Sequence, residues 1–269
     1  MGYHPPPPLR LISWNITLRC PLRCPHCYSD SGGEEIPDVL TTREAFRICD
    51  QIRSLGTPVV ILSGGEPMMR DDIFDIASYG SGLGLNMAMG TSGYLITEEN
   101  FPRIRSSGIR SLAISLDSAD PAVHDSFRGC TGSWERAVHA IRLSLQEGMQ
   151  VQINTTVITP DPASLDRLVQ FGISLGVRTF QVFIPVPTGR SADENYERYG
   201  AYESLLRHIL LAWSGDGISL RPTCIPQFRR VADEMGITGS RWGRGCIAGI
   251  SYCRIFANGD VTPCPYLPV

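Results

Sequence analysis

The strongest constraint on the fold is an alternation of segments that runs from residue 9 to about residue 214. Short apolar runs typical of buried β-strands alternate with longer runs whose apolar residues recur at helical spacing. A helix between two strands carries the chain back along the sheet, so the strands of such units pair in parallel. The alternation occurs six times and predicts an α/β fold, a partial (β/α)6 TIM-like barrel. Loops after the carboxyl ends of its strands then form the functional site.

The elements of this barrel can be placed along the chain. Strands are expected at Leu9 to Leu18, Pro58 to Ser63, Leu85 to Thr91, Ser111 to Asp117, Val151 to Thr159 and Thr179 to Ile184. Helices are expected at Thr42 to Leu55, Asp71 to Tyr79, Glu98 to Ser106, Trp134 to Gln146, Ala163 to Leu175 and Tyr199 to Trp213. Glycines follow several of these helices, where a left-handed residue ends a helix with little strain.

The pattern changes after the last of these helices. We therefore predict two domains, a barrel core at residues 1–214 and a small cysteine-rich extension at residues 215–269. Within the extension, Arg221 to Met235 is typical of a short strand-to-helix connection. The Asn258-Gly259 pair between apolar segments predicts the turn of a two-stranded hairpin.

Composition narrows the class of ligand and the compartment. The formal net charge of -3 and the pI near 6.0 offer no basic field for nucleic acid, so a small substrate or a peptide is expected. The chain has no run of roughly 18 apolar residues that could span a membrane, and its start lacks a secretory signal. We therefore expect a cytoplasmic protein. Reducing cytosol disfavours disulfides, so the nine cysteines indicate metal or cluster ligation.

Three cysteines, Cys20, Cys24 and Cys27, lie in the loop after the first predicted strand. Thiolates at this spacing can hold three irons of a [4Fe-4S] cluster and leave the fourth iron open for a chelating ligand. A zinc site is the alternative, although zinc usually takes four ligands arranged as two C-x-x-C pairs. His26 in the same loop can offer a flat ring to an adenine.

A second motif, Ser63-Gly64-Gly65-Glu66-Pro67, ends the second predicted strand. Glycines let a ligand approach the backbone closely, a carboxylate can accept hydrogen bonds from an ammonium group, and proline fixes the turn. Alone, this motif is also typical of an ordinary strand-to-helix turn. Next to three cysteines on the same rim of a parallel sheet, it indicates a ligand site.

With these two motifs the chain resembles the radical SAM superfamily. The resemblance implies that the three cysteines bind a [4Fe-4S] cluster and that Gly64, Gly65 and Glu66 bind the amino group of S-adenosylmethionine (SAM). It implies further SAM contacts at the ends of later strands, at Thr91, Ser115 and Asn154. It also implies an enzyme that reduces SAM to methionine and a 5'-deoxyadenosyl radical, which abstracts a hydrogen atom from the substrate.

The extension holds four more cysteines, Cys224, Cys246, Cys253 and Cys264, which are enough for one auxiliary Fe-S cluster. Zinc held by the four thiolates is the alternative. In the resembling families this region is a twitch or SPASM-type extension, and it binds Fe-S. Those relatives usually continue further, so we expect the extension to be truncated here; the sequence leaves open whether its ligand set is complete.

Across most of its length the chain is similar to the radical SAM proteins of heme biosynthesis by the siroheme route and to their heme d1 relatives. The distinctive stretches are Pro222 to Phe228 and the tail from Gly245 to Leu267. This resemblance implies an iron tetrapyrrole substrate. The implied reaction is oxidative decarboxylation of iron-coproporphyrin to heme b, a related deacetylation, or a heme d1 step. A reductant such as flavodoxin or ferredoxin is the expected partner.

A substrate with several carboxylates needs cationic contacts in the protein. Arg190, after the sixth predicted strand, is the first candidate because guanidinium pairs well with carboxylates. His208 and Tyr196 are weaker candidates.

Two other functions remain open. One is a peptide-maturing radical SAM enzyme with the same type of extension, but such enzymes commonly carry a peptide-recognition domain near the N-terminus, and eight residues precede the first predicted strand. The other is a noncatalytic Fe-S carrier. A carrier needs cysteines but has no use for the Gly64 to Pro67 turn.

Overall fold

The computed structural model describes residues 8–192, 199–213, 217–237 and 245–267. Its strands are β1 (Leu11–Thr17), β2 (Val59–Gly64), β3 (Asn86–Thr91), β4 (Ser111–Ser115), β5 (Gln150–Thr156), β6 (Thr179–Phe183), β7 (Ser219–Thr223), β8 (Tyr252–Ile255) and β9 (Val261–Thr262). Its helices are α1 (Thr42–Ser54), α2 (Ile73–Gly82), α3 (Phe101–Ser106), α4 (Pro121–Arg128), α5 (Ser133–Gln146), α6 (Pro162–Leu175), α7 (Tyr199–Ala212) and α8 (Phe228–Glu234), with 3-10 turns η1 (Pro67–Met69) and η2 (Gly189–Ser191).

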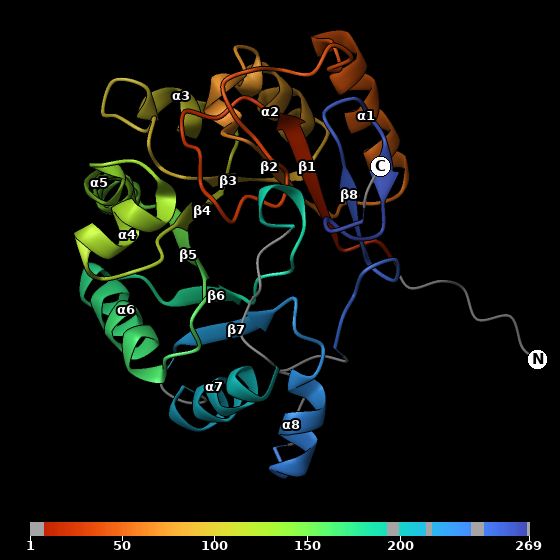
Figure 1. Cartoon of the computed structure of the whole chain (residues 1–269). Helices are drawn as coiled ribbons and strands as arrows, with labels where there is room; N and C mark the ends of the chain where they lie inside the picture. The colour runs from red at the N-terminus through yellow and green to blue at the C-terminus, as the bar shows by residue number, and fades with distance from the viewer. Residues whose placement is uncertain (1–7, 193–198, 214–216, 238–244, 268–269) are drawn as a thin grey trace, which may run out of the picture.

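Within the described residues, nine strands form one curved sheet in the order β7-β6-β5-β4-β3-β2-β1-β8-β9. Each neighbouring pair from β7 to β8 is parallel, and β9 is antiparallel to β8. Helices α1, α2, α5, α6 and α7 lie along the outer side of this sheet (Figure 1). The predicted α/β partial barrel is confirmed.

Strand β1 shows how the sequence separates the two faces of the sheet. Ile12, Trp14 and Ile16 are at most 1% exposed and belong to the apolar core that the helices cover. Successive side chains of a strand point to opposite faces, so Ser13 and Asn15 lie on the inner face. The sheet therefore has an apolar outer face and a polar inner face at this strand.

Local signals set the ends of the helices. The Glu44 carboxylate accepts the backbone N–H of Thr41 (2.9 Å), and the Thr41 hydroxyl accepts the N–H of Glu44 (3.4 Å), a capping box that starts α1. At the end of α6, Gly176 has a φ of 103°, which would strain any residue with a Cβ atom. The predicted left-handed glycine after this helix is confirmed.

One helix, α4, was not predicted. Asp120 caps its start, where the carboxylate accepts the N–H groups of Ala122 and Val123. Gly129, which has a φ of 65°, caps its end. Both ends carry ordinary start and stop residues, but eight residues are too few to show a clear helical period.

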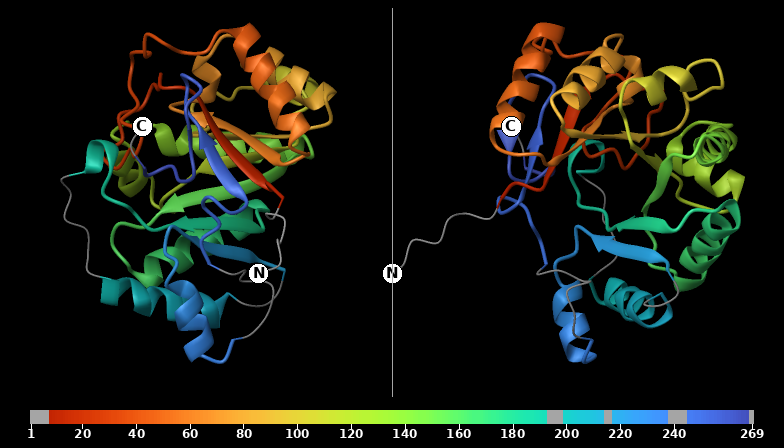
Figure 2. Two further views of the ribbon diagram at one scale, coloured as in Figure 1. Left: turned by 90° about the vertical axis from the view of Figure 1, so that its right-hand side faces the viewer. Right: turned by 180° about the vertical axis from the view of Figure 1, so that it is seen from behind.

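The segment after residue 214 joins the main sheet at both flanks. β7 pairs with β6, and β8 pairs with β1 in the register Ser13 to Arg254; Figure 2 shows β8 beside β1. The two predicted domains therefore share one sheet. The predicted hairpin is confirmed, since Arg254 pairs with Thr262 and Ile255 with Val261 around the Asn258-Gly259 turn.

In the part of the chain that the structure describes, no helix has the length and apolarity needed to cross a membrane.

Candidate active site

The three cysteines of the first motif lie between β1 and α1, after the carboxyl end of β1. This segment, the cysteine loop (residues 18–32), folds back on itself. The N–H of Cys20 donates to the carbonyl of Gly32 (2.5 Å), and the N–H of Cys27 donates to the carbonyl of Cys24 (3.2 Å). The N–H of Ser31 donates to Cys27 Sγ (3.4 Å). Backbone N–H groups directed at sulfur stabilise a thiolate and tune a cluster that it binds.

Burial strongly affects the thiols of this loop. It raises the pKa of Cys20 to about 12 and raises the pKa of Cys24, where the nearby charge of Arg128 opposes the shift. Arg128 Nη1 lies 4.0 Å from Cys24 Sγ. Metal ligation removes these thiol protons. Three thiols on one loop, with an N–H group and a cation directed at sulfur, suit an Fe-S cluster.

No three His, Cys, Asp or Glu side chains of the described residues gather closely enough to hold a single metal ion. The thiolates around a four-iron cube stand farther apart than those around one zinc ion.

Arg190 holds the cysteine loop from the segment after β6. Its guanidinium donates to the carbonyls of Cys24 (Nη1, 2.6 Å) and Ser31. Its Nε forms an ion pair with Asp30 Oδ1 (3.0 Å), and its backbone N–H donates to the carbonyl of Cys27 (3.0 Å). The guanidinium is thus occupied by the loop, which corrects the expectation that Arg190 contacts a substrate carboxylate.

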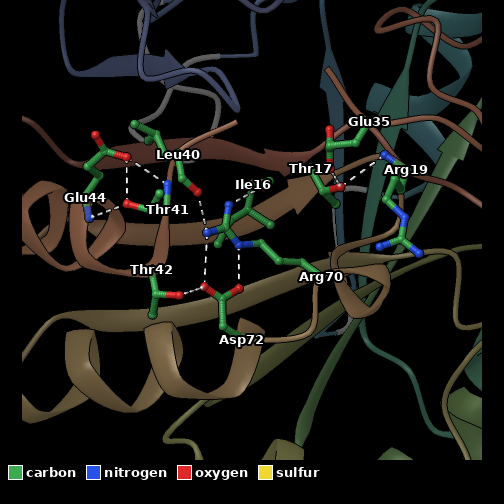
Figure 3. Close-up of polar contacts among 10 residues, drawn as sticks. All are labelled: Ile16, Thr17, Arg19, Glu35, Leu40, Thr41, Thr42, Glu44, Arg70 and Asp72. Atoms are coloured by element: carbon green, nitrogen blue, oxygen red, sulfur yellow. Dashed lines mark hydrogen bonds and ion pairs between the residues drawn. The ribbon is translucent and has the colours of Figure 1, made fainter. Parts of the chain in front are cut away.

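Arg70 holds the segments on either side of the cysteine loop (Figure 3). Its Nη1 donates to the carbonyl of Ile16 (2.8 Å), and its Nη2 donates to the carbonyl of Leu40 (2.7 Å). Asp72 fixes the guanidinium through an ion pair (2.6 Å). No sequence motif points to Arg70, because its main acceptors are backbone carbonyls.

The two glycines of the second motif lie directly against the end of β1 and the start of the cysteine loop. A Cβ atom on Gly64 would lie 2.2 Å from the carbonyl oxygen of Thr17, and one on Gly65 would lie 2.2 Å from that of Arg19. The N–H of Gly65 donates to Thr17 (2.9 Å), and the N–H of Glu66 donates to Arg19 (2.8 Å). Glycine is therefore required here for the approach of the loop backbone.

Glu66 is fully buried and joins the ends of β2 and β3. Its carboxylate accepts from the Thr91 hydroxyl (2.7 Å) and from the Ser92 hydroxyl and N–H (2.6 and 2.9 Å). Burial raises the pKa of Glu66, and these hydrogen bonds oppose the shift. The predicted SAM contacts of Glu66 and Thr91 stay predictions.

Ser115 and Asn154 are register partners at the ends of β4 and β5. The Asn154 side-chain oxygen accepts from Gln152 Nε2 (2.7 Å), and Gln152 Nε2 also lies 3.2 Å from the Gln181 oxygen. A row of amides therefore continues the polar inner face across β5 and β6. The structure brings the two predicted residues together on neighbouring strands, and their predicted SAM contacts stay predictions.

His26 stacks on Phe127, with ring centroids 3.9 Å apart and an interplanar angle of 5°. Burial, followed by the charge of Arg128, lowers the pKa of His26 to about 3, so the ring is neutral. Its Nδ1 is buried without a hydrogen-bond partner among the described residues. One ring face is occupied by Phe127, and the predicted adenine contact stays a prediction.

A buried ion pair lies beside His26. The Asp117 carboxylate accepts from Arg128 Nε (2.6 Å) and from the N–H of Thr156 (3.0 Å). Burial disfavours ionised Asp117, but Arg128 and then His124 outweigh it and lower the pKa of this carboxyl. Asp117 thus fixes Arg128 next to the cysteine loop. The start and stop residues of α4 were the only sequence signal for this arginine.

Three of the four extension cysteines share one neighbourhood. Cys224 has a φ of 64°, which is uncommon for residues other than glycine. Burial raises the pKa of Cys224 to about 11, and the charges of Cys264 and Cys246 add to the shift. The Cys224 thiol contacts the Tyr266 hydroxyl (3.3 Å).

Cys253 is separated from these three residues. It pairs with Ile12 across β8 and β1, and its side chain packs against the apolar core. Burial alone raises its pKa. The expected set of four thiolates is therefore corrected to three, because strand alternation turns Cys253 to the outer face.

The weaker substrate candidates do not extend the site. His208 Nε2 lies 2.8 Å from Asp166 Oδ1, between α7 and α6. Tyr196 lies outside the described residues.

Comparison with known proteins assigns the class. The sequence model of the radical SAM superfamily matches residues 14–197, and the chain belongs to this superfamily. SuiB of Streptococcus suis, solved with bound S-adenosylmethionine, shares the fold with a TM-score of 0.77 at 18% identity, over 96% of this chain and 60% of that one. Membership implies a [4Fe-4S] cluster and SAM.

Two curated relatives are more informative about the subgroup. The AdoMet-dependent heme synthase of Methanosarcina barkeri is 35% identical over 97% of this chain and 78% of that protein. The mycofactocin maturase MftC of Mycobacterium tuberculosis is 29% identical over 95% of this chain and 64% of that protein. The chain is thus a radical SAM enzyme homologous to AdoMet-dependent heme synthases.

Proposed function

We propose that this enzyme converts iron-coproporphyrin into heme b. The observation that carries the proposal is the 35% identity to a heme synthase over 97% of the chain. The polar inner face of the sheet supports it, because a substrate with several carboxylates needs polar partners wherever it is buried.

In this proposal the chain positions two cofactors. Cys20, Cys24 and Cys27 hold the [4Fe-4S] cluster, and the SAM contacts come from the turn after β2, the strand ends and the loop, namely Gly64, Gly65, Glu66, Thr91, Ser115, Asn154 and His26. When bound, the cluster and SAM supply a 5'-deoxyadenosyl radical that abstracts hydrogen. Arg190 and Arg128 keep the loop carbonyls and the Cys24 sulfur in place.

The substrate step is an oxidative decarboxylation. A hydrogen atom leaves the β-carbon of a propionate, the bond to the carboxylate breaks, and carbon dioxide and one electron depart as the vinyl double bond forms. Two propionates react in turn, each with one SAM. We place the electron acceptor at an auxiliary Fe-S cluster with Cys224, Cys246 and Cys264 as ligands. The expected partner is a reductant such as flavodoxin or ferredoxin, which would supply electrons to the cluster held by Cys20, Cys24 and Cys27.

The test is conversion of iron-coproporphyrin by the anaerobically reconstituted enzyme, followed by mass spectrometry. We expect the product to lose carbon dioxide and two hydrogen atoms for each of two side chains, and we expect Cys24→Ala to give no product. Intact iron-coproporphyrin with active enzyme would refute the substrate assignment. Modification of a peptide instead would favour a maturase, the function suggested by the similarity to the mycofactocin maturase.

A further inference from the structure

An arginine of β8, Arg254, lies inside the barrel with 2% of its surface exposed. Its register partner on β1 is Ser13, so it shares the inner face with Tyr252, whose hydroxyl bonds Ser13 Oγ (2.5 Å). The roles predicted for the other site residues do not explain why an arginine is buried at this position.

The guanidinium of Arg254 is enclosed but poorly paired. It lies 3.5 Å from the ring centroid of Phe256 and 5.2 Å from that of Tyr28. Its Nη1 donates to the carbonyl of Pro265 (2.6 Å), whereas its buried Nε has no acceptor among the described residues. No carboxylate of the described residues pairs with it. Arginine stays protonated in proteins, so a buried charge lacks a counter-charge.

The surroundings of Arg254 link the two groups of cysteines. Tyr28 directly follows Cys27, and Pro265 directly follows Cys264. Tyr266 connects the two groups of cysteines. Its ring packs edge-on against that of Tyr28, with ring centroids 5.6 Å apart, and its hydroxyl contacts Cys224. Arg254 therefore stands between the cysteine loop and the extension cysteines.

Two kinds of anion could neutralise this arginine, a substrate carboxylate or the thiolate clusters. A substrate carboxylate would need an access path to Arg254, of which only 2% is exposed. Clusters bound on both sides of Arg254 need no access path to it. Thiolates carry negative charge once they bind iron, and the net charge around a cluster sets its reduction potential.

We propose that Arg254 is the shared counter-cation of the two clusters and raises the reduction potential of each. The inference rests on the proposed function for the auxiliary cluster. A reduced cluster carries one more negative charge than an oxidised one, so a neighbouring cation stabilises the reduced form. The same charge favours retention of iron by both cysteine groups.

The experiment compares Arg254→Met, which removes the charge, with Arg254→Lys, which keeps it. Arg105→Met, at a side chain that is 67% exposed, is the matched control. Each protein is reconstituted anaerobically, its iron is counted, and its clusters are titrated against potential by EPR. We expect Arg254→Met to lower the midpoint potentials of both clusters, with the lysine variant close to wild type.

Each of the other outcomes supports or overturns the proposed role of Arg254. Unchanged potentials in Arg254→Met, with or without weaker binding of iron-coproporphyrin, overturn the proposal. If Arg254→Met loses iron and Arg254→Lys keeps it, the requirement for charge is supported; equal loss in both overturns it. If wild-type protein binds only about four irons, the auxiliary cluster of the proposed function fails, and the shift of the first cluster alone decides the role of Arg254.

Discussion

At the scale of single residues, arginines determine how the cysteine loop is held. Arg190 binds the carbonyls of the loop, and Arg128 lies against the sulfur of Cys24. Arg70 binds the chain on either side. Planar guanidinium groups can bind several oxygen atoms at once, which lysine cannot do in the same geometry. Contacts within the protein thus hold the loop backbone and its flanking segments in place.

Removal of the Arg190 clamp should weaken cluster binding. We expect Arg190→Met to retain less than half of the wild-type iron after gel filtration, because two carbonyl contacts and the Asp30 ion pair are lost. Arg167→Met, at a side chain that is 64% exposed, is the control and should retain all of it. Equal iron contents in the two variants would show that the clamp has no role.

The sequence showed some of these residues and not others. Cys20, Cys24 and Cys27 are close in the chain, so their spacing alone revealed a shared site. Arg190 was identified but assigned a different partner, because its carbonyl acceptors lie 166 and 159 residues earlier in the chain. Arg254 and Arg128 carry no local signal of burial. Their surroundings exist only after the sheet closes around them.

At the scale of elements, the close approach of β2 to the cysteine loop positions the site. The carbonyls of Thr17 and Arg19 accept N–H groups of Gly65 and Glu66. This contact needs two residues without Cβ atoms, so the Gly64-Gly65 pair is a packing requirement as well as a predicted SAM contact.

A methyl group added at Gly65 should push the turn after β2 away from the cysteine loop. Gly65→Ala places a Cβ atom 2.2 Å from a backbone carbonyl, whereas Gly82→Ala, in α2, meets nothing within 4 Å. We expect Gly65→Ala to lower the free energy of unfolding by about 2 kcal/mol and to reduce iron content, as overpacking against rigid backbone does. Gly82→Ala should be neutral or stabilising. Thermal unfolding of the two variants side by side checks this, and equal melting temperatures would contradict it.

The fold of the core was predictable because long amphipathic helices repeat between apolar strands. The flanks were less predictable. β7 and β8 are five and four residues long. The predicted strand-to-helix connection at Arg221 to Met235 corresponds to β7 and α8, and the predicted hairpin corresponds to β8 and β9. These local signals did not show where the strands join the sheet. Their place in the sheet follows from the strand edges left open by β6 and β1, which only the three-dimensional structure reveals.

At the scale of the whole molecule, the sheet brings distant cysteines to the same interior. Cys224 follows β7 at one flank, and Cys264 follows β9 at the other. The sequence could not separate Cys253 from them, because spacing does not tell which face of a strand a side chain takes.

Replacement of single cysteines tests whether Cys224 binds the auxiliary cluster and Cys253 does not. Cys224→Ser should lose about half of the iron, corresponding to one cluster of two. Cys253→Ser should keep all of it, because that thiol packs against the core. Iron analysis with EPR of the reduced proteins distinguishes the cases. Full iron in Cys224→Ser, or loss in Cys253→Ser, would contradict the assignment.

Radical SAM chemistry at this site can be tested by the yield of 5'-deoxyadenosine from SAM, measured anaerobically with dithionite, with and without iron-coproporphyrin. We predict that wild-type protein forms it, that iron-coproporphyrin increases the yield, and that Cys24→Ala forms none. A wild-type protein that holds its iron yet forms no 5'-deoxyadenosine under either condition would contradict the central claim that this site performs radical SAM chemistry.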